Sequence, residues 1–131
     1  MKKLFISCPM KGRTETDIRL SMDKMHKIAE AVFGEELEVI PSYIEDNPPE
    51  TADVAVWYLG ESIKMMAEAD YFIGIYDTAD GFSGCAIERE VSKRYGIPRY
   101  IISLSIIAPD VIAARRIERE RESYNSYNRL L

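Results

Sequence analysis

"YFIGIYDTADGFSGCAIEREV", residues 71–91, indicates the fold class of this chain of 131 residues. Residues 71–76 are almost wholly apolar, which is typical of a strand buried on both faces. The turn that follows contains glycine and leads into a helix predicted over 84–95, which Gly96 and Pro98 close. A buried strand that passes through a short turn into a helix predicts an α/β protein.

The same alternation of strand and helix continues on both sides of this stretch. A Thr14 to Asp17 capping pattern begins the first helix, and Gly34 ends it. Further strands are predicted at 4–8, 37–41 and 99–103, and further helices at 15–33 and 52–68. This order predicts a three-layer sandwich, with a mostly parallel sheet of four to five strands and helices on both faces.

The chain is expected to form a single domain over 1–131, in which 108–131 is a C-terminal helical tail. The tail begins helical and ends polar. Its "RRIERERE" run is interpreted as a solvated helical face whose charges pair with one another.

Composition narrows the class of protein. Hydrophobic residues make up 47%, enough for a core, and the net charge of -5 comes from interleaved acids and bases. This balance argues against a nucleic-acid polymer or a membrane as partner, but it allows a small anionic ligand. Cys8 and Cys85 fit no zinc spacing, so we expect free thiols, no metal and no cofactor. Without a signal peptide or a long apolar run, a soluble, cytoplasmic protein is expected.

Ligands of open α/β sheets bind beyond the carboxyl ends of the strands, which here points to 8–14, 41–48 and 77–88. In the first loop, backbone N–H groups at a helix start, together with Lys11 and Arg13, favour an anion, and Gly12 allows close approach. A solvated turn with two ordinary bases is the alternative. Tyr43 in the second loop is either a stacking residue for a base or a simple loop aromatic.

The third loop carries the main candidate for chemistry, Glu88. Gly84 permits a tight turn, and a carboxylate four residues later is suited to attack an electron-poor carbon such as a sugar's anomeric carbon. The alternative is a surface glutamate that favours a helix N-terminus. Asp77 and Asp80 either form the turn or orient a base or a sugar hydroxyl.

"FISCPMKGRTETD" at 5–17 and "EADYFIGIYDTADGFSGCAIERE" at 68–90 together resemble the nucleoside 2-deoxyribosyltransferase family, including its nucleoside 5'-monophosphate N-glycosidases. The pattern covers residues 4–102, and the chain is similar to a short, phage-associated branch of this family. The resemblance implies a flavodoxin-like, Rossmann-like sheet, a homodimer or larger homo-oligomer, and a nucleoside or nucleotide substrate.

The resemblance also implies roles for residues. Glu88 would be the nucleophile that forms a glycosyl-enzyme intermediate, which water or a second base resolves with retention. Gly84, with Ser83 beside it, would lie against the sugar or phosphate. The first loop would hold the 5' side of the substrate, through Cys8, Pro9, Met10, Lys11, Gly12, Arg13 and backbone amides.

The chain departs from the family pattern in several places. Relatives carry an aspartate where this chain has Ser62, and Glu61 replaces it only if the helix rotates. Phe82 lies where the hydrolases have a small polar residue, and Asn125 or Asn128 would serve only across a subunit boundary. These departures favour a second hypothesis, a non-catalytic nucleotide-binding module. A third is an interaction protein that uses its charged C-terminal helix.

Overall fold

The computed structural model describes residues 1–42, 47–50 and 53–130 and shows an α/β sandwich around a four-stranded sheet. The strand order is β2-β1-β3-β4, and every neighbouring pair is parallel. The elements are β1 (Lys2–Ile6), α1 (Glu15–Phe33), β2 (Leu37–Val39), α2 (Val54–Met66), β3 (Tyr71–Tyr76), α3 (Ser83–Arg94), β4 (Arg99–Ser103), α4 (Leu104–Ile107) and α5 (Pro109–Leu130). The predicted α/β class and parallel sheet are confirmed.

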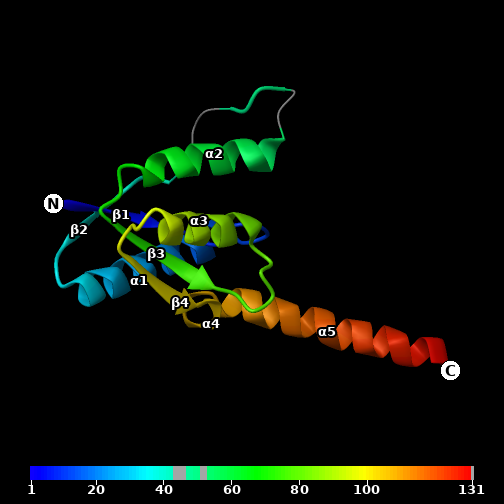
Figure 1. Ribbon diagram of the computed structural model, residues 1–131. Helices are drawn as coiled ribbons and strands as arrows, with labels where there is room; N and C mark the ends of the chain where they lie inside the picture. The colour runs from blue at the N-terminus through cyan, green and yellow to red at the C-terminus, as the bar shows by residue number, and fades with distance from the viewer. Residues whose placement is uncertain (43–46, 51–52, 131) are drawn as a thin grey trace.

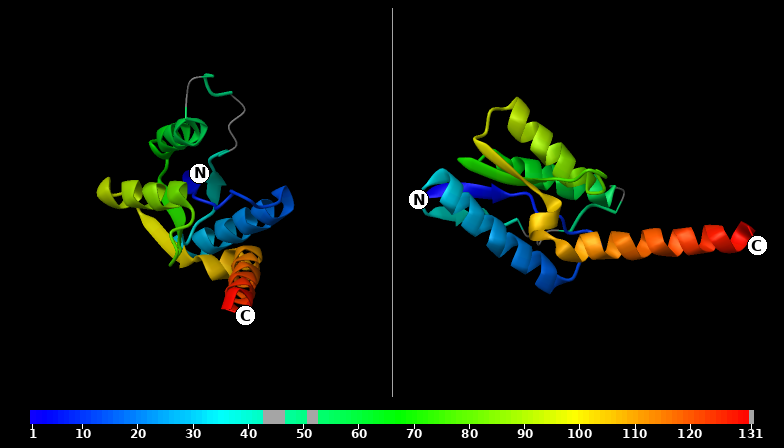
Figure 2. Two further views of the ribbon diagram at one scale, coloured as in Figure 1. Left: turned by 90° about the vertical axis from the view of Figure 1, so that its right-hand side faces the viewer. Right: turned by 90° about the horizontal axis from the view of Figure 1, so that it is seen from below.

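The sheet has helices on both faces, which gives three layers (Figures 1 and 2). α2 and α3 lie on one face, and α1 lies on the other together with α4 and the start of α5. Both central strands, β1 and β3, therefore end between two helical layers. Their carboxyl ends point toward the loops that precede α1 and α3.

Alternating side chains of the central strands build two cores. Leu4 and Ile6 face α1, while Phe5 faces the α2 and α3 side, as expected from the two-residue period of a strand. On β3, Phe72 stacks on Phe5 with ring centroids 5.8 Å apart. Gly74 provides room for the Phe72 ring, because a Cβ atom at residue 74 would lie 2.6 Å from its Cε1. The glycine inside "YFIGIY" is therefore a packing requirement of the strand.

Helix α1 begins and ends where the sequence predicts. The Thr14 side chain accepts a hydrogen bond from the Asp17 backbone N–H, and Gly34 ends the helix with φ of 75°. β3 and β4 also match their predicted ranges. β1 lies two residues earlier than predicted, because Lys2 and Lys3 pair with β2 at the sheet edge although both are exposed. Ser7 and Cys8 therefore follow the strand.

The C-terminal region differs most from expectation. The short helix α4 was not predicted, and α5 continues as one helix of 22 residues. In both figures α5 leaves the sandwich and extends away from it to the C-terminus (Figures 1 and 2). In the described part of the chain, no helix combines the length and apolar character that crossing a bilayer requires.

Candidate active site

Glu88 and Ser7 form a buried pair at the carboxyl end of β1. Ser7 directly follows the strand, and its Oγ donates a hydrogen bond of 2.8 Å to Glu88 Oε1. Ser7 is 1% exposed and Glu88 is 8% exposed. The Ser7 backbone N–H is fixed in turn by the carbonyl of Ile73 on β3. Glu88 lies in the second turn of α3.

The environment of Glu88 favours its protonated form. Burial raises the pKa of the Glu88 carboxyl from 4.5 to about 7, and the hydrogen bond from Ser7 acts in the opposite direction. Among the described residues, no lysine, arginine or histidine forms an ion pair with Glu88. A carboxyl that is held by one hydroxyl and titrates near neutral pH is suited to act as nucleophile, acid or base.

Two free thiols adjoin this pair. Cys85 lies one turn before Glu88 on α3, and Cys8 follows Ser7 along the chain; both are buried. Burial raises the pKa of Cys8 to about 11 and that of Cys85 to about 12, so both are protonated thiols near neutral pH. They line the interior beside Glu88 rather than acting as nucleophiles.

The loop 8–13 is held by Arg13, which is not available to a phosphate in this arrangement. The Arg13 side chain is 2% exposed, and its guanidinium donates to both oxygens of Asp110, each at 2.9 Å. It also donates to the Pro9 carbonyl at 2.8 Å and to Ser21 Oγ at 2.7 Å. Arg13 thereby joins the first loop to α5.

The rest of the first loop is a turn at the surface. The Arg13 backbone N–H bonds to the Met10 carbonyl, and Gly12 adopts φ of 74°. Lys11 and Met10 are exposed, and no atom lies within 4 Å of a Cβ placed on Gly12. Of the two positively charged residues of this loop, Lys11 therefore has its side chain at the surface, whereas that of Arg13 is buried.

Asp77 forms the turn after β3 and a second connection to α5. Its carboxylate accepts hydrogen bonds from the backbone N–H groups of Ala79 and Gly81. It also accepts one from each terminal nitrogen of Arg115, both at 2.8 Å. The hydrogen bonds from Arg115 lower the pKa of Asp77 to about 2. A Cβ on Gly81 would lie 2.6 Å from Arg115 Nη2, so glycine makes room for this pair. Both carboxylate oxygens of Asp77 therefore accept hydrogen bonds from within the protein.

Other residues of the third loop remain accessible. Asp80 has a positive φ of 45°, and its exposed carboxylate lies 3.3 Å from Arg89 Nη2. Ser83 is exposed at the first position of α3, and Gly84 follows it. Nothing lies within 4 Å of a Cβ placed on Gly84, so the fold itself does not require glycine there.

The structure does not connect the α2 candidates with Glu88. Glu61 forms an ion pair of 2.9 Å with Lys64 on the same helix. Ser62 is partly buried, and within the described residues no hydrogen bond links Glu61 or Ser62 to Glu88. Tyr43 lies outside the described residues.

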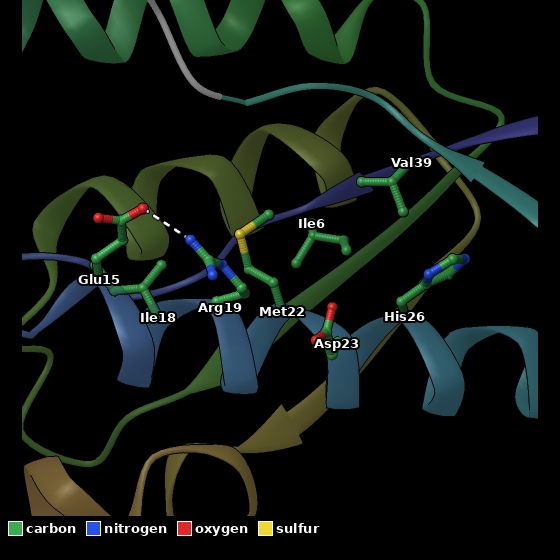
Figure 3. Close-up of a pocket in the computed structure, with 8 residues that line it drawn as sticks. All are labelled: Ile6, Glu15, Ile18, Arg19, Met22, Asp23, His26 and Val39. Atoms are coloured by element: carbon green, nitrogen blue, oxygen red, sulfur yellow. Dashed lines mark hydrogen bonds and ion pairs between the residues drawn. The ribbon is translucent and has the colours of Figure 1, made fainter.

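Two cavities lie near the carboxyl ends of the strands. The larger, about 340 Å³, lies between α1 and the ends of β1 and β2; Ile6, Met22 and Val39 line its apolar part, and Arg19, Asp23 and His26 lie along its α1 side (Figure 3). The smaller, about 170 Å³, lies between the first loop, Phe82 and α5. Neither Glu88 nor Ser7 lines either of these two cavities.

Three residues of the site were not predicted from sequence. Ser7 falls inside the strand predicted at 4–8, Asp110 belongs to the expected helical tail, and Arg115 belongs to the "RRIERERE" run that was predicted to be a solvated face. In the described ranges, no three His, Cys, Asp or Glu side chains are grouped so as to hold a metal ion. A comparison of this chain with protein-family models, curated proteins and solved structures finds no match.

Proposed function

We propose that the protein cleaves the N-glycosidic bond of a nucleoside or a nucleoside 5'-monophosphate, with Glu88 as nucleophile. The observation that carries this proposal is the Glu88 carboxyl itself, which is buried at the end of a central strand, held by Ser7 and not neutralised by a described cation. A carboxylate used only for structure is usually paired when it is buried to this extent.

In the proposed reaction, one Glu88 oxygen forms a bond to C1' of the pentose while the bond from C1' to the base nitrogen breaks. The base leaves with the electron pair and takes up a proton from solvent, and the water or second base that attacks next returns a proton to solvent. Water, or a second base, then attacks C1' and releases the Glu88 carboxylate with net retention. Because Ser7 holds Oε1, the other carboxylate oxygen, Oε2, is the natural attacking atom.

The proposal is tested by incubating the protein with ribo- and deoxyribonucleosides and their 5'-monophosphates and measuring free base by chromatography. Glu88→Gln is expected to lower turnover by at least about a hundredfold, the scale of removing a catalytic group. Glu90→Gln is the matched control, because Glu90 lies two residues away on the same helix and is exposed. Equal turnover in both variants contradicts the assignment of Glu88.

A second candidate function is a nucleotide-binding module that does not turn its ligand over. It is favoured by the burial of Glu88, which lines neither of the two cavities described above, and by the use of Arg13 in an ion pair with Asp110. Titration calorimetry on the same panel separates the two functions. Binding of a nucleotide that is recovered intact supports the module, and release of free base excludes it.

A further inference from the structure

The guanidinium of Arg13 holds the carboxylate of Asp110 by the two-point contact that arginine uses for oxyanions. Its Nε and Nη2 atoms donate to the two carboxylate oxygens, each at 2.9 Å. The third nitrogen, Nη1, donates to the Pro9 carbonyl at 2.8 Å. Because arginine binds carboxylate and phosphate groups with the same fork of N–H donors, Asp110 occupies the place that a phosphate would take on Arg13.

The carboxylate is the accessible part of this pair. The Arg13 side chain is 2% exposed, and that of Asp110 is 29% exposed. Both residues line the smaller cavity, of about 170 Å³, together with Lys11 and Gly12 of the first loop. A molecule in this cavity therefore meets Asp110, and a phosphate reaches the guanidinium only by displacing that carboxylate.

The smaller cavity lies at the start of the helix that carries Glu88. Phe82, which lines the cavity, is the N-cap residue of α3 and precedes Glu88 by six residues, or about 9 Å along a helix. On the other side, the cavity begins at Lys11, four residues after Ser7. Both chain segments that hold the Ser7 and Glu88 pair therefore continue into the walls of this cavity.

The charges around the smaller cavity cancel. Five charged side chains line it, and a sixth pairs with one of them at 2.8 Å: Lys11, Arg13, Arg115, Asp110 and Glu118, with Asp77 on Arg115. Three positive and three negative charges sum to zero, so the cavity offers no net attraction to a phosphate dianion. A neutral hydroxyl, in contrast, can donate to the exposed part of the Asp110 carboxylate without displacing it.

We propose that the smaller cavity receives the 5' end of the substrate and that Asp110 makes it select a free hydroxyl and reject a phosphate. This inference rests on the proposed function and narrows its substrate class to nucleosides without a 5'-phosphate. Phe82 supports the same selection, because its ring lines the cavity and offers no hydrogen bond to a phosphate.

Exchange of Asp110 tests the selection by a measurement that needs no turnover. Asp110→Ala leaves the Arg13 fork open to another oxyanion. Its melting temperature is expected to rise by at least about 3 °C in inorganic phosphate, relative to chloride at the same ionic strength. The wild type is expected to show no such rise. Glu118→Ala removes another carboxylate from the cavity and is expected to show a smaller one, because Arg13 keeps its partner.

The cleavage assay measures the selection on substrates. The wild type is expected to have a kcat/KM for a nucleoside at least about tenfold above that for its 5'-monophosphate. Asp110→Ala is expected to lower this ratio at least about tenfold through a gain on the monophosphate, and Glu118→Ala is expected to shift the ratio less. A purely structural role of Asp110 would lower kcat/KM for both substrates alike and leave the ratio unchanged.

The outcomes separate the two proposals. The selection by Asp110 is overturned if phosphate stabilises the wild type or Glu118→Ala as strongly as Asp110→Ala, or leaves Asp110→Ala unchanged. If Asp110→Ala does not fold, the same response is required of Asp110→Asn, which keeps the size of the side chain and loses its charge. If neither variant folds even in phosphate, Asp110 is only an anchor and the selection is wrong. Release of no base from any substrate contradicts the proposed function, whereas the phosphate response is measured without turnover.

Discussion

At the scale of single residues, a hydrogen bond of 2.8 Å joins Ser7 to Glu88, the nucleophile of the proposed reaction. Burial and hydrogen bonding oppose each other there: burial raises the pKa of Glu88, and Ser7 lowers it. The carboxyl thus remains able to change protonation state near neutral pH, which a fully exposed or salt-bridged glutamate does not do.

The raised pKa of Glu88 makes the stability of the protein depend on pH. The folded carboxyl has a pKa of about 7 against an ordinary 4.5, so the folded state binds the proton more tightly. Stability linked to this group is present below pH of about 4.5 and is lost as the pH rises through about 7. Glu88→Gln is therefore expected to gain stability relative to wild type over this window, by on the order of 3 kcal/mol.

Chemical denaturation of both proteins from acidic to neutral pH measures the difference. Other titrating groups are common to both proteins and cancel in the comparison. A difference that stays constant with pH contradicts the raised pKa.

The hydrogen bond from Ser7 lowers the pKa of Glu88. Ser7→Ala removes the hydroxyl that stabilises the Glu88 carboxylate, so the pKa of Glu88 is expected to rise above its wild-type value. Ser7→Thr, which keeps a hydroxyl, is the control and is expected to stay closer to wild type. NMR titration of the labelled Glu88 carboxyl carbon reads the effect directly. A downward shift in Ser7→Ala would show that the hydroxyl favours the protonated acid instead.

At the scale of elements, apolar runs and caps were sufficient to locate most of the fold from sequence. "YFIGIY" and the Thr14 cap are local signals, and the structure confirms both. β1 was misplaced because its first two residues are exposed lysines that pair with the edge strand β2, so that pairing rather than burial defines the start of β1. The position of Glu88 was predicted from local spacing. Its partner Ser7 was not, because 81 residues separate them and only the register of the sheet brings them together.

Gly74 and Gly84 are expected to respond oppositely to alanine. Gly74→Ala forces a methyl group to within 2.6 Å of the Phe72 ring and 3.5 Å of Ile101 Cδ1, so a loss of about 1–3 kcal/mol is expected. Gly84→Ala meets open space on a helix, where alanine is favoured, so stability is expected to hold or rise. Urea unfolding of the two variants compares them, and an equal loss in both contradicts the packing role of Gly74.

At the scale of the whole molecule, the two ion pairs to α5 divide the C-terminal helix into an anchored part and a free part. Arg13 with Asp110 and Arg115 with Asp77 join α5 to the loops on either side of the candidate site. Sequence alone distinguished neither Asp110 nor Arg115, the first residue of the "RRIERERE" run, from the other charged residues of α5, because all of them are ordinary charged residues on one helix. Only their partners in loops far along the chain separate the anchors from the rest.

Two truncations are expected to differ accordingly. Removal of 119–131 leaves both anchors, so the melting temperature is expected to stay within a few degrees of that of the full chain. Removal of 110–131 takes Asp110 and Arg115 away, leaves the Arg13 guanidinium without its carboxylate, and is expected to lower the melting temperature by at least about 5 °C. Differential scanning calorimetry measures both. Equal melting temperatures would mean that the ion pairs do not secure the loops.

The two buried cysteines can report how often the region around Glu88 opens to solvent. Cys8 and Cys85 adjoin Ser7 and Glu88 and are kept from solvent by the same surroundings. A thiol-reactive dye labels these cysteines only while this region is open, so the labelling rate measures how often it opens. A nucleotide that binds beside Glu88 and keeps this region closed is therefore expected to lower the labelling rate of Cys8 and Cys85. The measurement uses the natural cysteines and needs no introduced label site.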